Sequence, residues 1–148
     1  METKTINISE VITQCAIKAA CEVYSLDREK LLSETRERMI VWARRMCMKI
    51  IREETALSLQ AIANVFGKDH ASILHSIRQH DALIEIEDKE YMAIYSEFMA
   101  RYNKFKAFDL GDAYDKQTML VKRIHEIKNR IQLLAEEAAM LIDEYVKH

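Results

Sequence analysis

The chain contains almost no residues that end a helix: its 148 residues include two glycines and no proline. In a helix interior, glycine costs about 1 kcal/mol and proline about 3 kcal/mol relative to alanine, so both usually lie between helices. Ala, Glu, Lys, Met, Ile and Leu, which are compatible with helices, are abundant. We therefore predict an all-α protein, a multi-helix bundle with hardly any room for strands.

The cysteines and the apolar runs bear on the cellular compartment. Cys15, Cys21 and Cys47 lie within apolar helical patterns and form no C-x-x-C pair, as is typical of small core residues in a reducing compartment. No uninterrupted apolar run approaches about 18 residues, and no basic and then apolar leader opens the chain. We expect a cytoplasmic protein with no membrane partner.

Helix caps and apolar spacing predict the first helices. Ser9 is expected to cap a helix over residues 10–24, and Asp27 to cap a short helical turn. A longer helix is expected from about residue 38 to 54. Its predicted buried residues are Ile40, Ala43, Cys47 and Ile50. Its predicted exposed, basic face carries Arg38, Trp42, Arg45, Lys49 and Arg52.

Charge is unevenly distributed, although the net charge is only −2. Residues 28–52 contain eight Lys/Arg and three Asp/Glu, whereas residues 81–97, which we expect to be an acidic helix, contain six acids and one lysine. A basic patch beside an acidic helix is compatible with a surface that faces DNA. Solvated helix faces explain the same pattern, so charge alone leaves both interpretations open.

Two further helices are predicted around the first glycine. Ser58 should cap the helix "LQAIANVF" at residues 59–66, Gly67 should end it, and Asp69 should cap the next helix through Ser72. The expected buried face of that next helix carries Ile73, Leu74 and Ile77, and its exposed face carries His70, Ala71, His75 and Arg78. A short helix, a glycine turn and a capped helix are typical of a helix-turn-helix.

Three of the five histidines fall within this same stretch. His70, His75 and His80 recur every five residues, so successive side chains point about 140° apart on a helix. Helical zinc ligands usually lie four residues apart on one face, so the spacing argues against a metal site. We predict no metal and no other cofactor. The histidines are then either exposed or capping residues, or part of a surface that reads nucleic acid.

The run from Leu31 to Gln79 resembles the C-terminal DNA-binding domain of the bacterial replication initiator DnaA, and the similarity extends over roughly residues 10–95. The family's signature is a glycine-ended helix, a basic residue, Asp-His, a small hydroxylated pair and an apolar-His step. The run "FGKDHASILHS" reproduces most of this signature. The resemblance implies a helix-turn-helix protein that binds double-stranded DNA site-specifically and acts in replication or transcription control.

The resemblance also implies individual roles at the DNA. Asp69, His70 and Ala71 would meet base edges in the major groove, where their acceptor, donor and methyl groups suit cytosine, a purine and thymine. Asp69 can cap its helix at the same time. Arg36 matches the arginine that enters the neighbouring minor groove. The other implied DNA-binding residues are Arg38, Arg44, Arg45, Lys68, Ser72, His75 and Arg78, with phosphate contacts from Arg44, Ser72, His75 and Arg78 and general attraction from Arg45 and Lys49.

The initiator's ATPase requires a glycine-rich loop that ends in Gly-Lys-Ser/Thr, and the only Gly-Lys here, Gly67-Lys68, is followed by Asp. We therefore predict no nucleotide partner and no ATP hydrolysis. No Ser-His-Asp or Cys-His arrangement is supported by spacing, so we expect no catalytic residues and no enzyme.

The second glycine lies in "AFDLGDAYD", residues 107–115, where we expect a corner, followed by a last helix from Asp115. Apolar residues of this helix alternate steps of four and three and form a heptad seam. The seam consists of Leu120, Ile124, Ile127, Ile131, Leu134, Ala138, Leu141 and Tyr145. With Ile124 at heptad position a, Arg123 would face Lys128 of a parallel partner, so a simple parallel zipper is disfavoured.

The predicted organisation is a DnaA-like helix-turn-helix domain at residues 1–106 and a C-terminal amphipathic heptad helix at residues 113–148. The heptad helix either joins copies of the chain into a homo-oligomer or packs against the chain's own helix at residues 83–105. Self-association would use Leu120, Ile124, Ile127, Ile131, Leu134 and Leu141. The rival function is a helical protein–protein interaction module that kept the fold but lost DNA binding.

Overall fold

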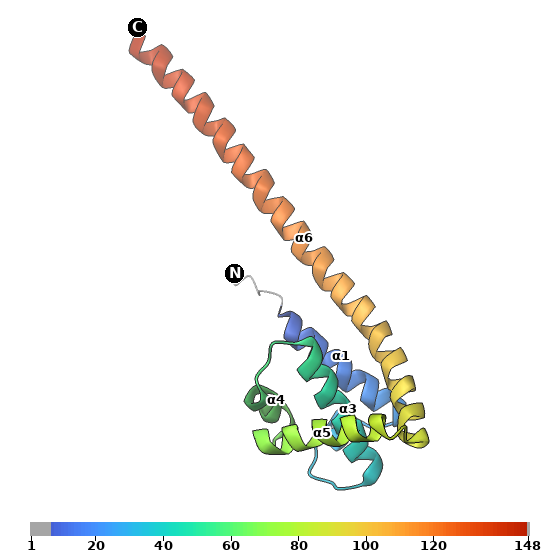
Figure 1. The fold of residues 1–148 in the computed structure, drawn as a ribbon. Helices are drawn as coiled ribbons and strands as arrows, with labels where there is room; N and C mark the ends of the chain where they lie inside the picture. Colours follow the sequence, from blue (N-terminus) through green and yellow to red (C-terminus); the bar gives the residue numbers. More distant parts are fainter. Residues whose placement is uncertain (1–6, 148) are drawn as a thin grey trace. The chain divides into compact units, whose positions relative to one another are not determined.

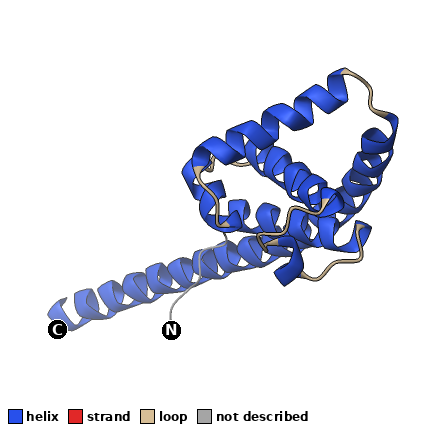
Figure 2. Ribbon diagram, turned by 90° about the horizontal axis from the view of Figure 1, so that it is seen from below, coloured by secondary structure: helices blue, strands red, loops and turns tan. Residues whose placement is uncertain are grey.

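A computed structural model of the chain describes residues 7–147. They form six helices: α1 (Ile8–Val23), α2 (Arg28–Leu31), α3 (Arg38–Glu54), α4 (Leu59–Phe66), α5 (His70–Glu85) and α6 (Lys89–Lys147). No strand occurs among these residues (Figure 2). The predicted all-α fold is confirmed. Between residues 7 and 147, no helix is both long enough and apolar enough to cross a membrane.

The chain divides into two compact units, Met1–Gly111 and Asp112–His148. In the first unit, α3 runs through the centre, and α1, α2, α4 and α5 all pack against it (Figure 1). The first part of α6 contributes Tyr91, Phe98 and Tyr102, which are fully buried in the same core. This core fixes the position of the α4–α5 corner, because Ile62, Phe66 and Ile73 are buried in it.

Side chains cap most helices of the first unit where the sequence predicts. Asp27, Ser58 and Asp69 accept backbone N–H hydrogen bonds from the first turns of α2, α4 and α5. The cap of α1 differs from the prediction: Asn7 Oδ1 accepts from the N–H of Glu10 at 3.2 Å, and Ser9 lies inside the helix. Both residue types are good caps, so propensity alone did not distinguish them.

Two helices end in a left-handed residue that is not glycine. Ser25 follows α1 with φ 52°, and Glu87 follows α5 with φ 55°. The next residue in each case donates its backbone N–H into the last turn, from Leu26 to Cys21 and from Asp88 to Leu83. The predicted continuous acidic helix at residues 81–97, and the helix at 83–105, are therefore wrong, because the chain turns at residues 86–88 before α6 begins.

The corner predicted at residues 107–115 is also wrong, because α6 runs without a break from Lys89 to Lys147. Gly111 lies inside this helix. A single interior glycine costs about 1 kcal/mol, which neighbouring helix formers compensate when no proline is present. The predicted start of a separate helix at Asp115 is corrected with it.

The predicted bounds of α3 are confirmed, but its exposed face is smaller than predicted. Trp42 is buried, and its ring meets the ring of Tyr91 edge to face with centroids 5.0 Å apart. The start of α6 supplies Tyr91 and thereby covers the tryptophan. The sequence pattern of α3 alone carries no information about this later helix.

Candidate nucleic-acid interface

A tight corner joins α4 to α5. Gly67 has φ 63° and ψ 37°, and Lys68 donates its backbone N–H to the carbonyl oxygen of Ala63 at 2.9 Å. Glycine suits this position because a left-handed backbone crowds a Cβ atom. Asp69 Oδ1 then accepts from the N–H of Ser72 at 2.7 Å and starts α5. The predicted helix-turn-helix geometry, with Ser58, Gly67 and Asp69 in these places, is confirmed.

The first turns of α5 present polar side chains outward. Asp69, His70, Ala71, His75 and Arg78 are exposed, and Ser72 is half-buried. The opposite face holds the buried Ile73 and Ile77, which fix the rotation of the helix about its axis. The hydrogen bond from the Ser72 N–H lowers the pKa of Asp69, so this carboxylate stays ionised and accepts hydrogen bonds.

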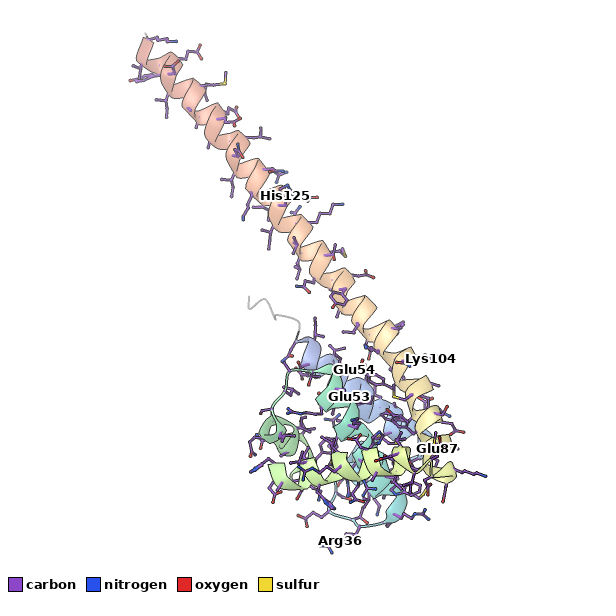
Figure 3. The ribbon with its side chains drawn as sticks, in the orientation of Figure 1. Arg36, Glu53, Glu54, Glu87, Lys104 and His125 are labelled. Carbon is purple, nitrogen blue, oxygen red and sulfur yellow. The ribbon has the colours of Figure 1, made fainter. Side chains whose placement is uncertain are left out.

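A loop between α2 and α3 carries Arg36, which is exposed and points away from the bundle (Figure 3). Arg44 on α3 attaches this loop to the bundle. Its Nε donates to the carbonyl oxygen of Leu31 at 2.6 Å, and its Nη1 donates to that of Thr35 at 2.8 Å. The side chain of Arg44 is only 4% exposed, and burial lowers its pKa. The resemblance implies a phosphate contact for Arg44, whereas here two of its nitrogens donate hydrogen bonds to the loop.

A cleft of about 660 Å³ brings this loop and α5 together. Its walls include side chains from the loop, from α3, from the α4–α5 corner and from α5 itself. The predicted DNA-binding residues that line it are Arg36, Arg44, Lys68, Asp69, Ala71, Ser72 and His75. Arg44 Nη2 is buried here and has no hydrogen-bond partner among the described residues. The cleft therefore combines three basic side chains with hydroxyls and an imidazole, which suit an anionic backbone, and it also contains the carboxylates of Glu34 and Asp69.

Four of the predicted DNA-binding residues do not line the cleft: Arg38, Arg45, His70 and Arg78. Arg38 pairs with Glu90 at 3.1 Å and stacks over the ring of Trp42 at 4.3 Å from its centroid. Arg45 is half-buried, and burial lowers its pKa.

The basic face predicted for α3 is partly neutralised by acidic neighbours. Lys49 pairs with Asp81 at 2.7 Å and with Glu53 at 3.0 Å. These contacts come from α5 and from α3 itself, so part of the positive charge counted in the sequence is engaged within the bundle.

The three histidines of the signature have different environments. His70 and His75 are exposed, whereas His80 is buried, with its Nδ1 2.6 Å from the hydroxyl oxygen of Tyr91. Burial lowers the pKa of His80 to about 4, so its imidazole is neutral near pH 7. Throughout residues 7–147, no three side chains of His, Cys, Asp or Glu come close enough to hold a metal ion.

Three polar residues that line the cleft were not among the predicted DNA-binding residues: Glu34, Thr35 and Ser76. Thr35 lines it and fixes Arg44 through its carbonyl oxygen, and Ser76 lines it from α5. Ser76 lies four residues after Ser72, so helical spacing could have found it. The role of the Thr35 carbonyl is a backbone property that no sequence pattern marks.

In the second unit, the seam is exposed. Exposed fractions run from 46% at Ile127 to 61% at Ile131 for the six residues predicted to self-associate, and Tyr145 is 84% exposed. The six are Leu120, Ile124, Ile127, Ile131, Leu134 and Leu141. Their heptad spacing places them along one side of α6.

Comparison with known proteins agrees with the α4–α5 geometry. The profile of a family described as "Bacterial dnaA protein helix-turn-helix" matches residues 14–79, fewer than half of the chain. Three relatives called "Chromosomal replication initiator protein DnaA" are similar to this chain over 68 to 93 residues.

The relative from Synechococcus sp. (strain JA-2-3B'a(2-13)) is 38% identical over 45% of this chain and 15% of its own length. The relative from Bacteroides thetaiotaomicron is 29% identical over 62% of this chain and 18% of its own length. The relative from Jannaschia sp. (strain CCS1) is 29% identical over 58% of this chain and 17% of its own length. The matched segments thus span less than a fifth of each relative.

Proposed function

Since residues 14–79 form a helix-turn-helix of the bacterial DnaA family, we propose that this chain binds double-stranded DNA site-specifically. The binding would serve the control of replication or of transcription. The chain would act by binding, without a nucleotide and without catalysis, in the cytoplasm. Its one Gly-Lys pair, at Gly67-Lys68, lacks the Ser or Thr that a phosphate-binding loop needs.

The observation that best supports this proposal is the cleft between the Arg36 loop and α5. A recognition helix needs a second element that grips the backbone beside the groove, because phosphate contacts set the orientation of the helix on the duplex. In this chain, the first turn of α5 and the Arg36 loop share one concave surface. The surface would hold one strand's backbone while α5 enters the major groove.

The proposed roles follow from exposure and from position. Asp69, His70 and Ala71, at the exposed start of α5, would meet base edges. Arg36 would reach into the adjacent minor groove. Backbone contacts would come from Lys68, Ser72, His75 and Arg78.

Three arginines take roles that depend on their packing. Arg44 would hold the loop in place through its two hydrogen bonds, and a phosphate would reach its buried Nη2 only if the loop moved. Arg38 and Arg45 would add only general attraction, because one is paired with Glu90 and the other is half-buried.

Self-association is a second part of the proposal. A single helix-turn-helix makes a modest DNA interface, and such domains commonly gain affinity by presenting two copies to two half-sites. The exposed seam of α6 is a surface through which copies of the chain would join.

Selection from a random duplex library at two salt concentrations tests the DNA-binding proposal. An enriched motif that survives near physiological salt is the expected result. A double variant that carries Arg36→Ala and His70→Ala should abolish the enrichment. The control variant Lys104→Ala, which changes a residue on α6 outside the cleft, should retain it. Uniform weak binding that disappears near physiological salt would contradict the proposal and favour a protein–protein interaction module.

A further inference from the structure

The seam leaves an apolar surface without a partner in the second unit. Its ends, Leu120 and Tyr145, are 25 residues apart on one helix, which corresponds to about 38 Å at a rise of 1.5 Å per residue. Exposed fractions of its large side chains are 46% to 84%. An exposed apolar stripe of this length is typical of a helix that pairs with another helix.

The charges beside the seam change sign along the helix. With Ile124 at position a, position g is occupied by Arg123 and Arg130 in the first half of the seam and by Glu137 and Glu144 in the second half. Position g borders the seam, and its side chains meet those of a paired helix. One flank of the helix is thus basic at one end and acidic at the other.

From this arrangement we propose that a second copy of this chain covers the seam in antiparallel orientation. The two-fold axis of the pair lies between Gln132 and Leu133 of each copy. The inference rests on the proposed self-association and specifies its geometry. An antiparallel pair of identical helices places the g flank of one copy against the g flank of the other, so the basic half meets the acidic half.

With the axis at this position, every seam residue faces a seam residue of the other copy. Leu120 lies opposite the partner's Tyr145, and Ile124 lies opposite the partner's Leu141. The two inner layers place Ile127 opposite the partner's Ala138 and Ile131 opposite the partner's Leu134. All eight apolar positions are then covered, which is the condition for burying the whole stripe.

The same axis aligns the charges. Arg130 comes beside the partner's Glu137, and Arg123 comes beside the partner's Glu144. Each contact occurs twice, because the two copies are related by symmetry. Among the described residues, neither Arg130 nor Glu137 takes part in an ion pair within its own helix, whereas Arg123 makes an exposed contact of 3.5 Å with Glu126.

Neighbouring registers fail on both counts. A shift of one heptad in either direction leaves two seam residues of each copy without a seam residue opposite them. It also brings Arg130 beside the partner's Arg130, or Glu137 beside the partner's Glu137. Like charges in contact destabilise a pairing, so the pattern selects one register.

A parallel pair gains nothing from these charges. Position g would then face position e of the other copy, so that Arg123 meets the partner's Lys128 and Arg130 meets the partner's Ala135. Glu137 would meet the partner's Ile142. The parallel arrangement therefore contains one repulsive contact on each flank and no attractive one.

Charge-reversal variants of the full chain test the geometry. An acidic variant carries Arg123→Glu and Arg130→Glu, and a basic variant carries Glu137→Arg and Glu144→Arg. In an antiparallel pair, each variant alone places like charges together, so its dimer dissociation constant should rise at least about 10-fold. An equimolar mixture should regain the wild-type affinity as a heterodimer, because every contact again joins unlike charges.

Matched controls are Lys122→Glu and Glu136→Arg, which reverse charges at the exposed f positions on the side away from the seam. They should leave the dissociation constant within about twofold of wild type. Light scattering gives the mass of each sample, and circular dichroism shows whether the helices persist.

Two outcomes overturn different parts of the argument. A wild-type chain that is monomeric at tens of micromolar would overturn self-association and this geometry together. A wild-type dimer whose two variants do not rescue each other would overturn the antiparallel pairing and leave self-association standing. Neither outcome bears on DNA binding, which the library selection measures separately.

Discussion

Arg44 Nη1 donates a hydrogen bond of 2.8 Å to the carbonyl oxygen of Thr35, and this contact attaches the Arg36 loop to the central helix of the bundle. A buried guanidinium can hold two carbonyl oxygens at once, because its donors are fixed in one plane. The position of Arg36 over the cleft thus depends on a side chain that is itself hidden from solvent.

Arg44→Lys should lower the free energy of unfolding by about 1–3 kcal/mol, because one ammonium cannot replace both hydrogen bonds and leaves a buried carbonyl oxygen unsatisfied. Urea denaturation measures the loss. DNA affinity should also fall, and most on sites with an A/T flank, because the loop carries Arg36. Arg36→Ala, at an exposed position, should leave the unfolding midpoint unchanged. Unchanged stability together with weaker DNA binding would instead indicate a direct phosphate contact by Arg44.

His70→Ala should cost about 1–3 kcal/mol on the preferred site and reduce the ratio of specific to random binding, because a base-edge contact is removed. Fluorescence anisotropy with the selected site and with a scrambled duplex measures both affinities. Gln79→Ala changes an exposed residue later on the same helix and serves as the control. If His70→Ala leaves the ratio as it was, this residue does not read bases.

Arg36→Ala should weaken binding most when an A/T tract flanks the site. A narrow A/T-rich minor groove concentrates negative potential, so an inserted guanidinium is held most strongly there. The measurement compares dissociation constants for otherwise identical duplexes with A/T and G/C flanks. Equal losses on the two flanks would reduce Arg36 to a general phosphate contact.

Ile131→Asp should split the proposed homodimer, because it places a charge in the central layer of the seam, where desolvation costs several kcal/mol. Light scattering at tens of micromolar should then show a monomer. Asn129→Asp adds the same charge at an exposed f position and should leave the mass unchanged. A wild-type monomer whose melting temperature falls with Ile131→Asp would mean that the seam packs within its own chain.

His80 should make stability depend on pH. Burial lowers its pKa from 6.5 to about 4, while Asp81, Glu53, Lys49 and Arg45 are the charged groups near it. Between pH 6.5 and 4 the unfolded chain binds more protons at this site, so stability falls as the pH falls through that window. In His80→Gln, the free energy of unfolding measured with urea should depend less on pH in this window. The reduction corresponds to a difference of up to about one bound proton between the unfolded and folded chains. A slope identical to that of wild type would show that His80 is not held neutral.

Local signals predicted much of the first unit. Ser58, Gly67 and Asp69 each act within one turn of themselves, through a cap, a left-handed residue and a second cap. These short-range contacts need no knowledge of the rest of the fold. The α4–α5 corner and the exposed start of α5 were therefore predictable from residues 58–72 alone.

Features that depend on distant residues were not predictable. Trp42 lies on the polar side of the α3 pattern, and Tyr91, which comes from the later helix α6, packs against its ring. Arg44 looks like another surface cation until the backbone of residues 31–35 folds over it. Gly111 led to the wrong prediction of a corner. A single glycine is outweighed by the helix formers on both sides of it, so the helix continues.

The thiol of Cys47 donates to the carbonyl oxygen of Ala16 at 3.3 Å between α1 and α3, and its side chain is fully buried. Burial raises the thiol pKa well above its usual range, so the folded chain offers neither access nor thiolate to an alkylating reagent. Reaction at this sulfur requires α1 to leave α3, whereas Cys21 is half-buried at the edge of the same interface. The rate at which Cys47 is alkylated therefore reports opening of the whole bundle, and the rate at Cys21 reports local fluctuation of α1.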